Sequence, residues 1–106
     1  MKRVIILSPY KGDREANLRY ARFCLADSLR RGEAPFASHL LYTQVLEDDV
    51  PEHRVMGLAC ESEWLASAQL VACYIDNGVS NGMTYTLDQA RGLGIPVENR
   101  TLNASY

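Results

Sequence analysis

The chain has 106 residues, of which 47% are hydrophobic and 23% are charged. That length suits one compact domain and is too short for two, and the composition excludes a disordered or fibrous protein. With 11 Lys and Arg against 13 Asp and Glu, the net charge of -2 argues against a nucleic-acid partner, which would need a basic face.

The apolar segments of the chain are short. The two longest runs, residues 4–7 and 70–75, have the length of strands and lie far below the roughly 20 residues that a membrane span needs. Met1, Lys2 and Arg3 lead directly into the first run, without the long apolar stretch and cleavage site of a secretory signal. We therefore expect a cytoplasmic protein without a membrane partner.

The cysteines and histidines show no metal-binding spacing. Cys24, Cys60 and Cys73 are odd in number and widely spaced, so we expect buried, reduced thiols and no disulfide framework. His39 and His53 lie too far apart in the sequence to form a recognisable metal motif. We expect neither a metal nor another cofactor.

Strand and helix patterns alternate in the first half of the chain. Residues 4–7 are rich in β-branched side chains and predict a fully buried strand. Apolar residues at three- and four-residue steps then predict an amphipathic helix that begins at Asp13, its N-cap, and closes at Gly32. Residues 34–37 predict a short second strand, whereas residues 39–44 indicate no clear state.

The second half repeats this alternation. Pro51 fits the first turn of a second helix that runs to about residue 68, and residues 70–75 predict a second buried strand. Residues 82–91 predict a third helix, and residues 95–97 predict the last strand. Strands that alternate with helices indicate a parallel sheet, because parallel neighbours need long, right-handed crossover connections.

We therefore expect a single α/β domain over residues 1–98, built on a doubly wound parallel sheet of about four strands with helices on both faces. Residues 99–106 are expected to form a loose C-terminal tail. In such a sheet, ligands bind outside the carboxyl ends of the strands. The loops over residues 8–13, 38–44 and 76–82 are accordingly the expected place of the functional site.

The start of the third predicted helix is a candidate anion site. Ser80 and Gly82 follow a strand and offer a hydroxyl and a closely approachable backbone at a helix N-terminus, which suits a phosphate. The alternative is that Ser80 caps the helix and Gly82 eases the turn.

Two further side chains are candidates for a role with the ligand, each with a structural alternative. Tyr10 can stack on a base or hydrogen-bond a sugar, or it can pack on a neighbour. His39 can contact a phosphate or transfer a proton, or it can serve as a hydrogen-bonded structural residue. His53, at a charged helix start, is expected on the solvated surface.

The second predicted helix carries a candidate acid or base. Glu61 and Glu63 precede Trp64, and at about 100° per residue only one of the two glutamates can face the sheet. Glu61 is the inward choice because Leu58 and Leu65 lie three and four residues away from it. A carboxylate there can act as general acid or base, whereas the alternative is a solvated helix face.

Together these residues resemble the nucleoside 2-deoxyribosyltransferase-like superfamily, and more closely its small, phage-associated, uncharacterised members. The resemblance runs from Val4 to Arg100. Its signals are Ser8-Pro9-Tyr10 with Gly12-Asp13, Asn17 and Cys24, Pro35-Phe36-Ala37 with His39-Leu40-Leu41, Glu52-His53-Arg54 with Gly57, and Ser80-x-Gly82-Met83 before Ala90 and Gly94-Ile95-Pro96-Val97.

The resemblance implies a Rossmann- or flavodoxin-like fold, a nucleotide-type ligand, and a homodimer or larger homo-oligomer with shared sites. Enzymes of this superfamily cleave or exchange the N-glycosidic bond of deoxynucleosides or their monophosphates. Carried over to this chain, the catalytic positions are Glu61, Tyr10 and Thr86. The substrate- and phosphate-binding positions are Ser8, Gly12, His39, Ser80, Gly82 and Met83.

The pattern departs from the superfamily at one position. The monophosphate N-glycosidases carry a Ser-x-Gly-x-x-Tyr-Glu-Leu-like stretch, and its nucleophilic Glu aligns with Thr86, before Leu87. A Thr is a poor nucleophile without an adjacent base and supplies no negative charge to an oxocarbenium ion. Asp88 points about 200° away around the helix and is an unsuitable replacement.

Two functions remain open at this point. The first is a nucleotide N-glycosidase or deoxyribosyltransferase-like enzyme acting on a (deoxy)nucleoside monophosphate, with Glu61 and a water in place of the missing nucleophile. The second is a non-catalytic protein that binds or sequesters a nucleotide through Ser80, Gly82 and Tyr10.

Overall fold

The four strands form one parallel sheet in the computed structural model, which describes residues 1–102. The strands are β1 (Arg3–Leu7), β2 (Ala34–Phe36), β3 (Leu70–Tyr74) and β4 (Val97–Arg100), in the order β2-β1-β3-β4. The register places Ile5 of β1 opposite Phe36 of β2 and Val71 of β3. This arrangement confirms the expected α/β fold with a parallel sheet.

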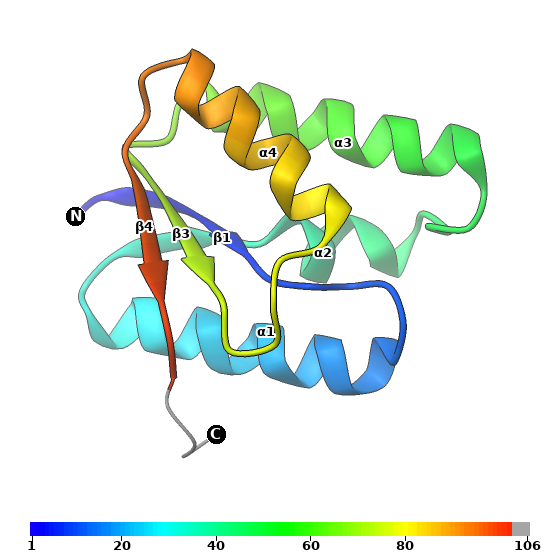
Figure 1. Cartoon of the computed structure of the whole chain (residues 1–106), viewed down its shortest axis with the longest axis horizontal. Coiled ribbons are helices and arrows are strands. Elements are labelled where there is room, and N and C mark those ends of the chain that lie inside the picture. Colours follow the sequence, from blue (N-terminus) through cyan, green and yellow to red (C-terminus); the bar gives the residue numbers. More distant parts are fainter. Residues whose placement is uncertain (103–106) are drawn as a thin grey trace.

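The helices lie on both faces of the sheet, as Figure 1 shows. Helix α1 (Arg14–Arg30) covers one face, and helices α3 (Pro51–Leu65) and α4 (Asn81–Gly92) cover the other. The segment without a clear sequence pattern forms the short helix α2 (Ser38–Leu41) and the 3-10 turn η1 (Tyr42–Gln44). Among residues 1–102, no helix is long and apolar enough to cross a membrane.

Alternate residues of the central strands enter two separate cores. Val4 and Ile6 of β1 pack with Tyr20 and Cys24 of α1 on one face. On the other face, Ile5 and Leu7 belong to a core that includes Leu65 of α3 and Leu87 of α4. Because both faces of the strands are covered, their sequences read as continuous apolar runs rather than as alternating patterns.

The first long helix begins where the sequence predicts. The Asp13 side chain accepts a hydrogen bond from the Ala16 backbone N–H over 3.1 Å, which is the N-cap contact. The helix ends at Arg30, and Gly32 follows with a φ of 78°, a backbone conformation that favours glycine.

The last strand lies later in the chain than the sequence indicates. Strand β4 begins at Val97 and continues to Arg100, so the first two residues of the predicted tail belong to the sheet. Its polar sequence hides it because β4 is an edge strand with two exposed residues in the middle. The end of the predicted tail, residues 103–106, lies outside the described residues.

Candidate active site

A cavity of about 320 Å³ opens at the carboxyl end of β1, between the β1–α1 loop, α2, η1 and the first turns of α3 and α4. This is the end of the sheet at which parallel α/β proteins bind ligands, and the volume is in the range of small-molecule sites. Seven of the nine sequence-predicted site residues line the cavity: Ser8, Tyr10, His39, Glu61, Ser80, Gly82 and Met83.

The other two predicted residues do not line it. Gly12 lies in the exposed turn before α1 with a φ of 99°, where it serves the turn. Thr86 is only 2% exposed and is a buried residue of α4 that does not line the cavity. Its hydroxyl instead contacts Glu61, which does line the cavity.

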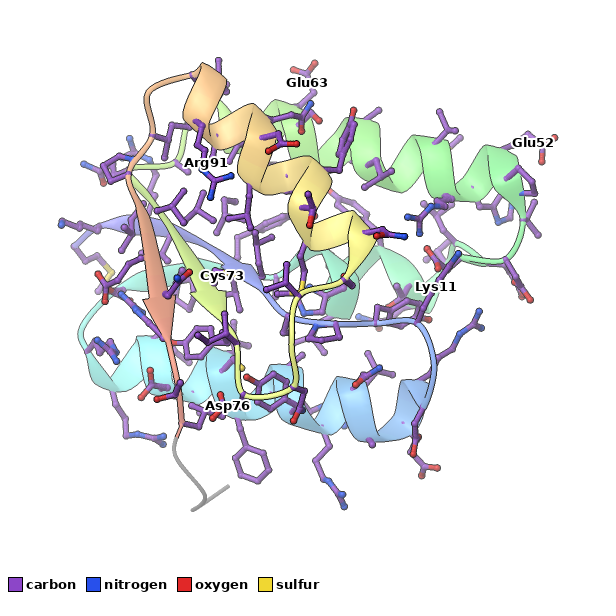
Figure 2. All side chains as sticks on the ribbon, viewed as in Figure 1. Lys11, Glu52, Glu63, Cys73, Asp76 and Arg91 are labelled. Carbon is purple, nitrogen blue, oxygen red and sulfur yellow. The ribbon has the colours of Figure 1, made fainter. Side chains whose placement is uncertain are left out.

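Glu61 is the central carboxylate of the site. It is 8% exposed, and both of its oxygens accept hydrogen bonds. The Thr86 hydroxyl donates to Oε1 over 2.6 Å, and the Ser38 hydroxyl donates to Oε2. Figure 2 shows Glu63, the other candidate on α3, pointing away from the sheet, so Glu61 is the inward residue as predicted.

Ser8 and His39 form a second polar pair in the cavity. Ser8 Oγ lies 2.6 Å from His39 Nε2 at the junction of β1 and α2. His39 is half-buried, and its partial removal from water lowers the pKa of its imidazole to about 4. The ring is therefore neutral at neutral pH and has one nitrogen available to accept a hydrogen bond.

At the start of α4, Ser80 caps the helix and also borders the cavity, so the structural role and a role in anion binding are compatible. The Ser80 hydroxyl caps the helix by accepting a hydrogen bond from the Met83 backbone N–H over 3.3 Å. At the same time Ser80, Asn81 and Gly82 all border the cavity. The first backbone N–H groups of a helix have no carbonyl acceptor within the helix, so this end of α4 is suited to an anion.

Several charged residues of the site were not among the sequence-predicted ones. Arg54 Nη1 pairs with Asp48 Oδ1 at 3.3 Å, and Arg54 Nη2 lies 3.8 Å from the position that a β-carbon on Gly82 would occupy. The guanidinium therefore reaches from α3 to the start of α4. Lys11 also borders the cavity, on the β1–α1 loop, and Figure 2 shows it at the end of the molecule where α3 begins.

His53 differs from its expected place on the solvated surface. It is half-buried and lines the cavity, and its Nδ1 accepts a hydrogen bond from the Glu47 backbone N–H over 2.9 Å. The segment before α3 thus contacts the first helical turn through Glu47, and both His53 and Arg54 line the cavity. The sequence signal for both was the Glu52-His53-Arg54 cluster at the helix start.

Comparisons with known proteins agree with this fold. A protein-family model described as a domain of unknown function, DUF7768, matches residues 2–100. A solved structure described as a 2-deoxyribosyltransferase from the psychrotolerant bacterium Bacillus psychrosaccharolyticus is similar with a TM-score of 0.75 and 18% sequence identity, covering 98% of this chain and 75% of that chain. No curated protein matches the sequence. The structural likeness confirms the deoxyribosyltransferase-like fold, and the family match shows that the chain belongs to the DUF7768 family.

Proposed function

We propose that this protein binds a (deoxy)nucleoside monophosphate in the cavity and cleaves its N-glycosidic bond, as a hydrolase or a deoxyribosyltransferase-like enzyme. The observation that carries the proposal is the buried Glu61 carboxylate on the cavity wall, with its two oxygens held by Thr86 and Ser38. A carboxylate fixed in this way offers negative charge at a defined place, which an oxocarbenium-like transition state requires.

The cavity offers groups suited to both the phosphate and the base of a nucleotide. The start of α4 and the Arg54 guanidinium provide N–H donors for a phosphate. Tyr10, Leu58 and Met83 provide apolar and aromatic surface for the base. Glu61 borders the same cavity, where its carboxylate can face the sugar.

A specific observation favours the second candidate, a non-catalytic nucleotide-binding protein. The superfamily pattern expects a second carboxylate at position 86, and Thr86 is instead bonded to Glu61. The other carboxylate of the cavity wall, Asp48, is paired with Arg54. Binding alone needs no second carboxylate, so the phosphate and base surfaces also support sequestration.

The proposal extends to the location and the oligomeric state of the protein. We propose that the protein is cytoplasmic and forms a homodimer or larger homo-oligomer. Support for association comes from large apolar side chains that stay exposed in the single chain, among them Leu41 at 48% and Trp64 at 54%.

The test is incubation with a panel of deoxynucleoside and ribonucleoside monophosphates and the matching nucleosides, following free base by chromatography and binding by thermal stabilisation. Base release from a monophosphate by the wild type, reduced at least 100-fold in Glu61→Gln with binding retained, supports the enzyme. Asp88→Asn is the matched control, because Asp88 is an exposed carboxylate on α4 outside the cavity. Stabilisation without base release supports the binding protein, and neither effect with any nucleotide refutes both.

A further inference from the structure

The Ser8 hydroxyl and the His39 imidazole are placed as a proton donor and an acceptor base. Ser8 Oγ and His39 Nε2 are 2.6 Å apart, and both residues border the cavity. Ser8 is 5% exposed at the end of β1, so its hydroxyl is held in place rather than free to exchange partners with bulk water. A hydroxyl within hydrogen-bond reach of an imidazole is the arrangement in which the imidazole can take its proton.

Helix α2 connects this pair to the carboxylate. Ser38 donates its hydroxyl hydrogen to Glu61, and the next residue, His39, pairs with Ser8. Two consecutive residues therefore hold the imidazole and the carboxylate at the same wall of one cavity. The short helix is itself tied down, since the Thr43 hydroxyl donates to the His39 carbonyl over 2.6 Å.

His39 is neutral at neutral pH, so one ring nitrogen has a free lone pair, and an imidazolium formed there gives up its proton readily. Its burial favours the neutral ring and lowers its pKa to about 4. In the tautomer with the hydrogen on Nδ1, the Nε2 lone pair faces the Ser8 hydroxyl.

We propose that Ser8 and His39 form a proton relay that activates the water attacking the anomeric carbon of the nucleotide, in the role that a second carboxylate would otherwise fill. The inference rests on the proposed N-glycosidase function and names the groups that would activate water where no nucleophilic carboxylate is present at position 86. For His39 it selects proton transfer from the two roles that the sequence left open, and for Ser8 it replaces the binding role implied by the resemblance.

In the proposed step, water is added across the N-glycosidic bond. The water oxygen bonds to the anomeric carbon while the water gives one proton to Ser8 Oγ, and Ser8 gives its own hydroxyl proton to His39 Nε2. The bond from the anomeric carbon to the base nitrogen breaks, and its electron pair stays on the base. The imidazolium then loses its proton, by way of Ser8 or solvent, and the base nitrogen gains one, so that the net reaction is hydrolysis. Glu61 faces the positive charge that develops on the sugar.

The test compares kcat and nucleotide affinity in Ser8→Ala and His39→Gln, using the monophosphate from which the wild type releases base. General-base catalysis is typically worth about 10²- to 10⁴-fold, so we expect kcat to fall by about that factor in His39→Gln, with the nucleotide Kd within about threefold of wild type. Ser8→Ala should lower kcat at least about tenfold, and added imidazole should restore part of the activity of His39→Gly. Ser62→Ala is the control, because Ser62 itself does not line the cavity and its hydroxyl donates to the Leu58 backbone carbonyl and to the Gln89 side chain.

The outcomes separate the relay from the proposed function. Suppose that the wild type releases base and that folded His39→Gln or Ser8→Ala keeps kcat within about threefold of wild type. That result overturns the relay and leaves the N-glycosidase function standing. A loss that appears only as weaker nucleotide binding also overturns the relay, because it indicates a ligand contact. Absence of base release by the wild type overturns the enzymatic function and the relay with it. Circular dichroism establishes folding, and Ser8→Ala, which removes one oxygen atom, is the variant least able to disturb it.

Discussion

Thr86 on α4 donates its hydroxyl hydrogen to Glu61 Oε1 on α3 over 2.6 Å, and both side chains are buried. Thr86, the position at which the resemblance implies a nucleophilic glutamate, thus positions the one carboxylate of the cavity that has no cationic partner among the described residues. A second buried carboxylate at this distance would repel the first. A Thr hydroxyl instead holds Glu61 in a single orientation.

Removing this donor should destabilise the protein. In Thr86→Val the shape is retained, but Glu61 Oε1 loses its partner, and an unpaired buried polar group costs about 1 to 3 kcal/mol in the free energy of unfolding. Thr86→Ser keeps the hydroxyl and should lose less. Urea denaturation of both variants measures the difference, and equal stability of Thr86→Val and wild type would contradict the role of this hydrogen bond.

Arg54 should distinguish a nucleotide from a nucleoside. Its guanidinium lies beside Gly82 at the start of α4, where the phosphate is proposed to bind. We expect Arg54→Gln to raise the Kd for the monophosphate about tenfold or more, which corresponds to about 1.4 kcal/mol, and to change the Kd for the nucleoside by less than about twofold. Isothermal titration measures both constants.

The control for this prediction is Arg22→Gln, because Arg22 is an exposed arginine of α1 outside the cavity. It should leave both constants unchanged. If Arg54→Gln weakens nucleoside and monophosphate equally, Arg54 shapes the cavity as a whole and does not recognise the phosphate.

The half-buried His39 should make the protein less stable in mild acid. Its pKa is lowered by burial from 6.5 to about 4, so between these two values the unfolded chain binds a proton that the folded protein does not. The contribution of His39 is therefore most favourable above pH 6.5 and falls as the pH decreases, by up to about 3 kcal/mol near pH 4. Unfolding free energies measured from pH 4 to pH 7 should rise less steeply in His39→Gln than in wild type.

His53→Gln is the control for the pH dependence. It keeps His39 and the charged groups that share the cavity, namely Lys11, Asp48, Arg54 and Glu61. A slope in His39→Gln equal to that of wild type would assign the acid sensitivity to those other groups.

A buried ion pair ties the edge strand to the rest of the fold. Arg100 is 4% exposed, and its guanidinium donates to both carboxylate oxygens of Glu33 over 2.8 Å. This pairing lowers the pKa of Glu33 to about 2. Arg100→Met leaves the Glu33 charge without this partner, and we expect a loss of about 3 to 5 kcal/mol in unfolding free energy.

The double variant Arg100→Met with Glu33→Met should recover part of that loss, because no unpaired charge remains. Arg31→Met, at an exposed arginine near Glu98, should change stability by about 0.5 kcal/mol at most. Denaturant titration of the three variants measures this pattern. A single variant Arg100→Met as stable as wild type would show that the pair does not hold β4.

The sequence predicted helices and strands well where the signal lies within the segment itself. The apolar runs of β1 and β3 identify buried strands. Asp13 marks the start of α1 because its side chain accepts a hydrogen bond from the Ala16 backbone N–H, three residues later. The edge strand β4 was placed too early, because its buried residue Arg100 is a charged side chain whose partner is 67 residues away.

The sequence by itself determined the α/β fold, the end of the sheet where a site can form, and the inward direction of Glu61. Only the tertiary structure decided which groups meet there. Thr86 reaches Glu61 across 25 residues of sequence, and Ser8 reaches His39 across 31. Helical and strand periodicity report which face of an element is buried, whereas the partner of a polar group on that face depends on how separate elements pack.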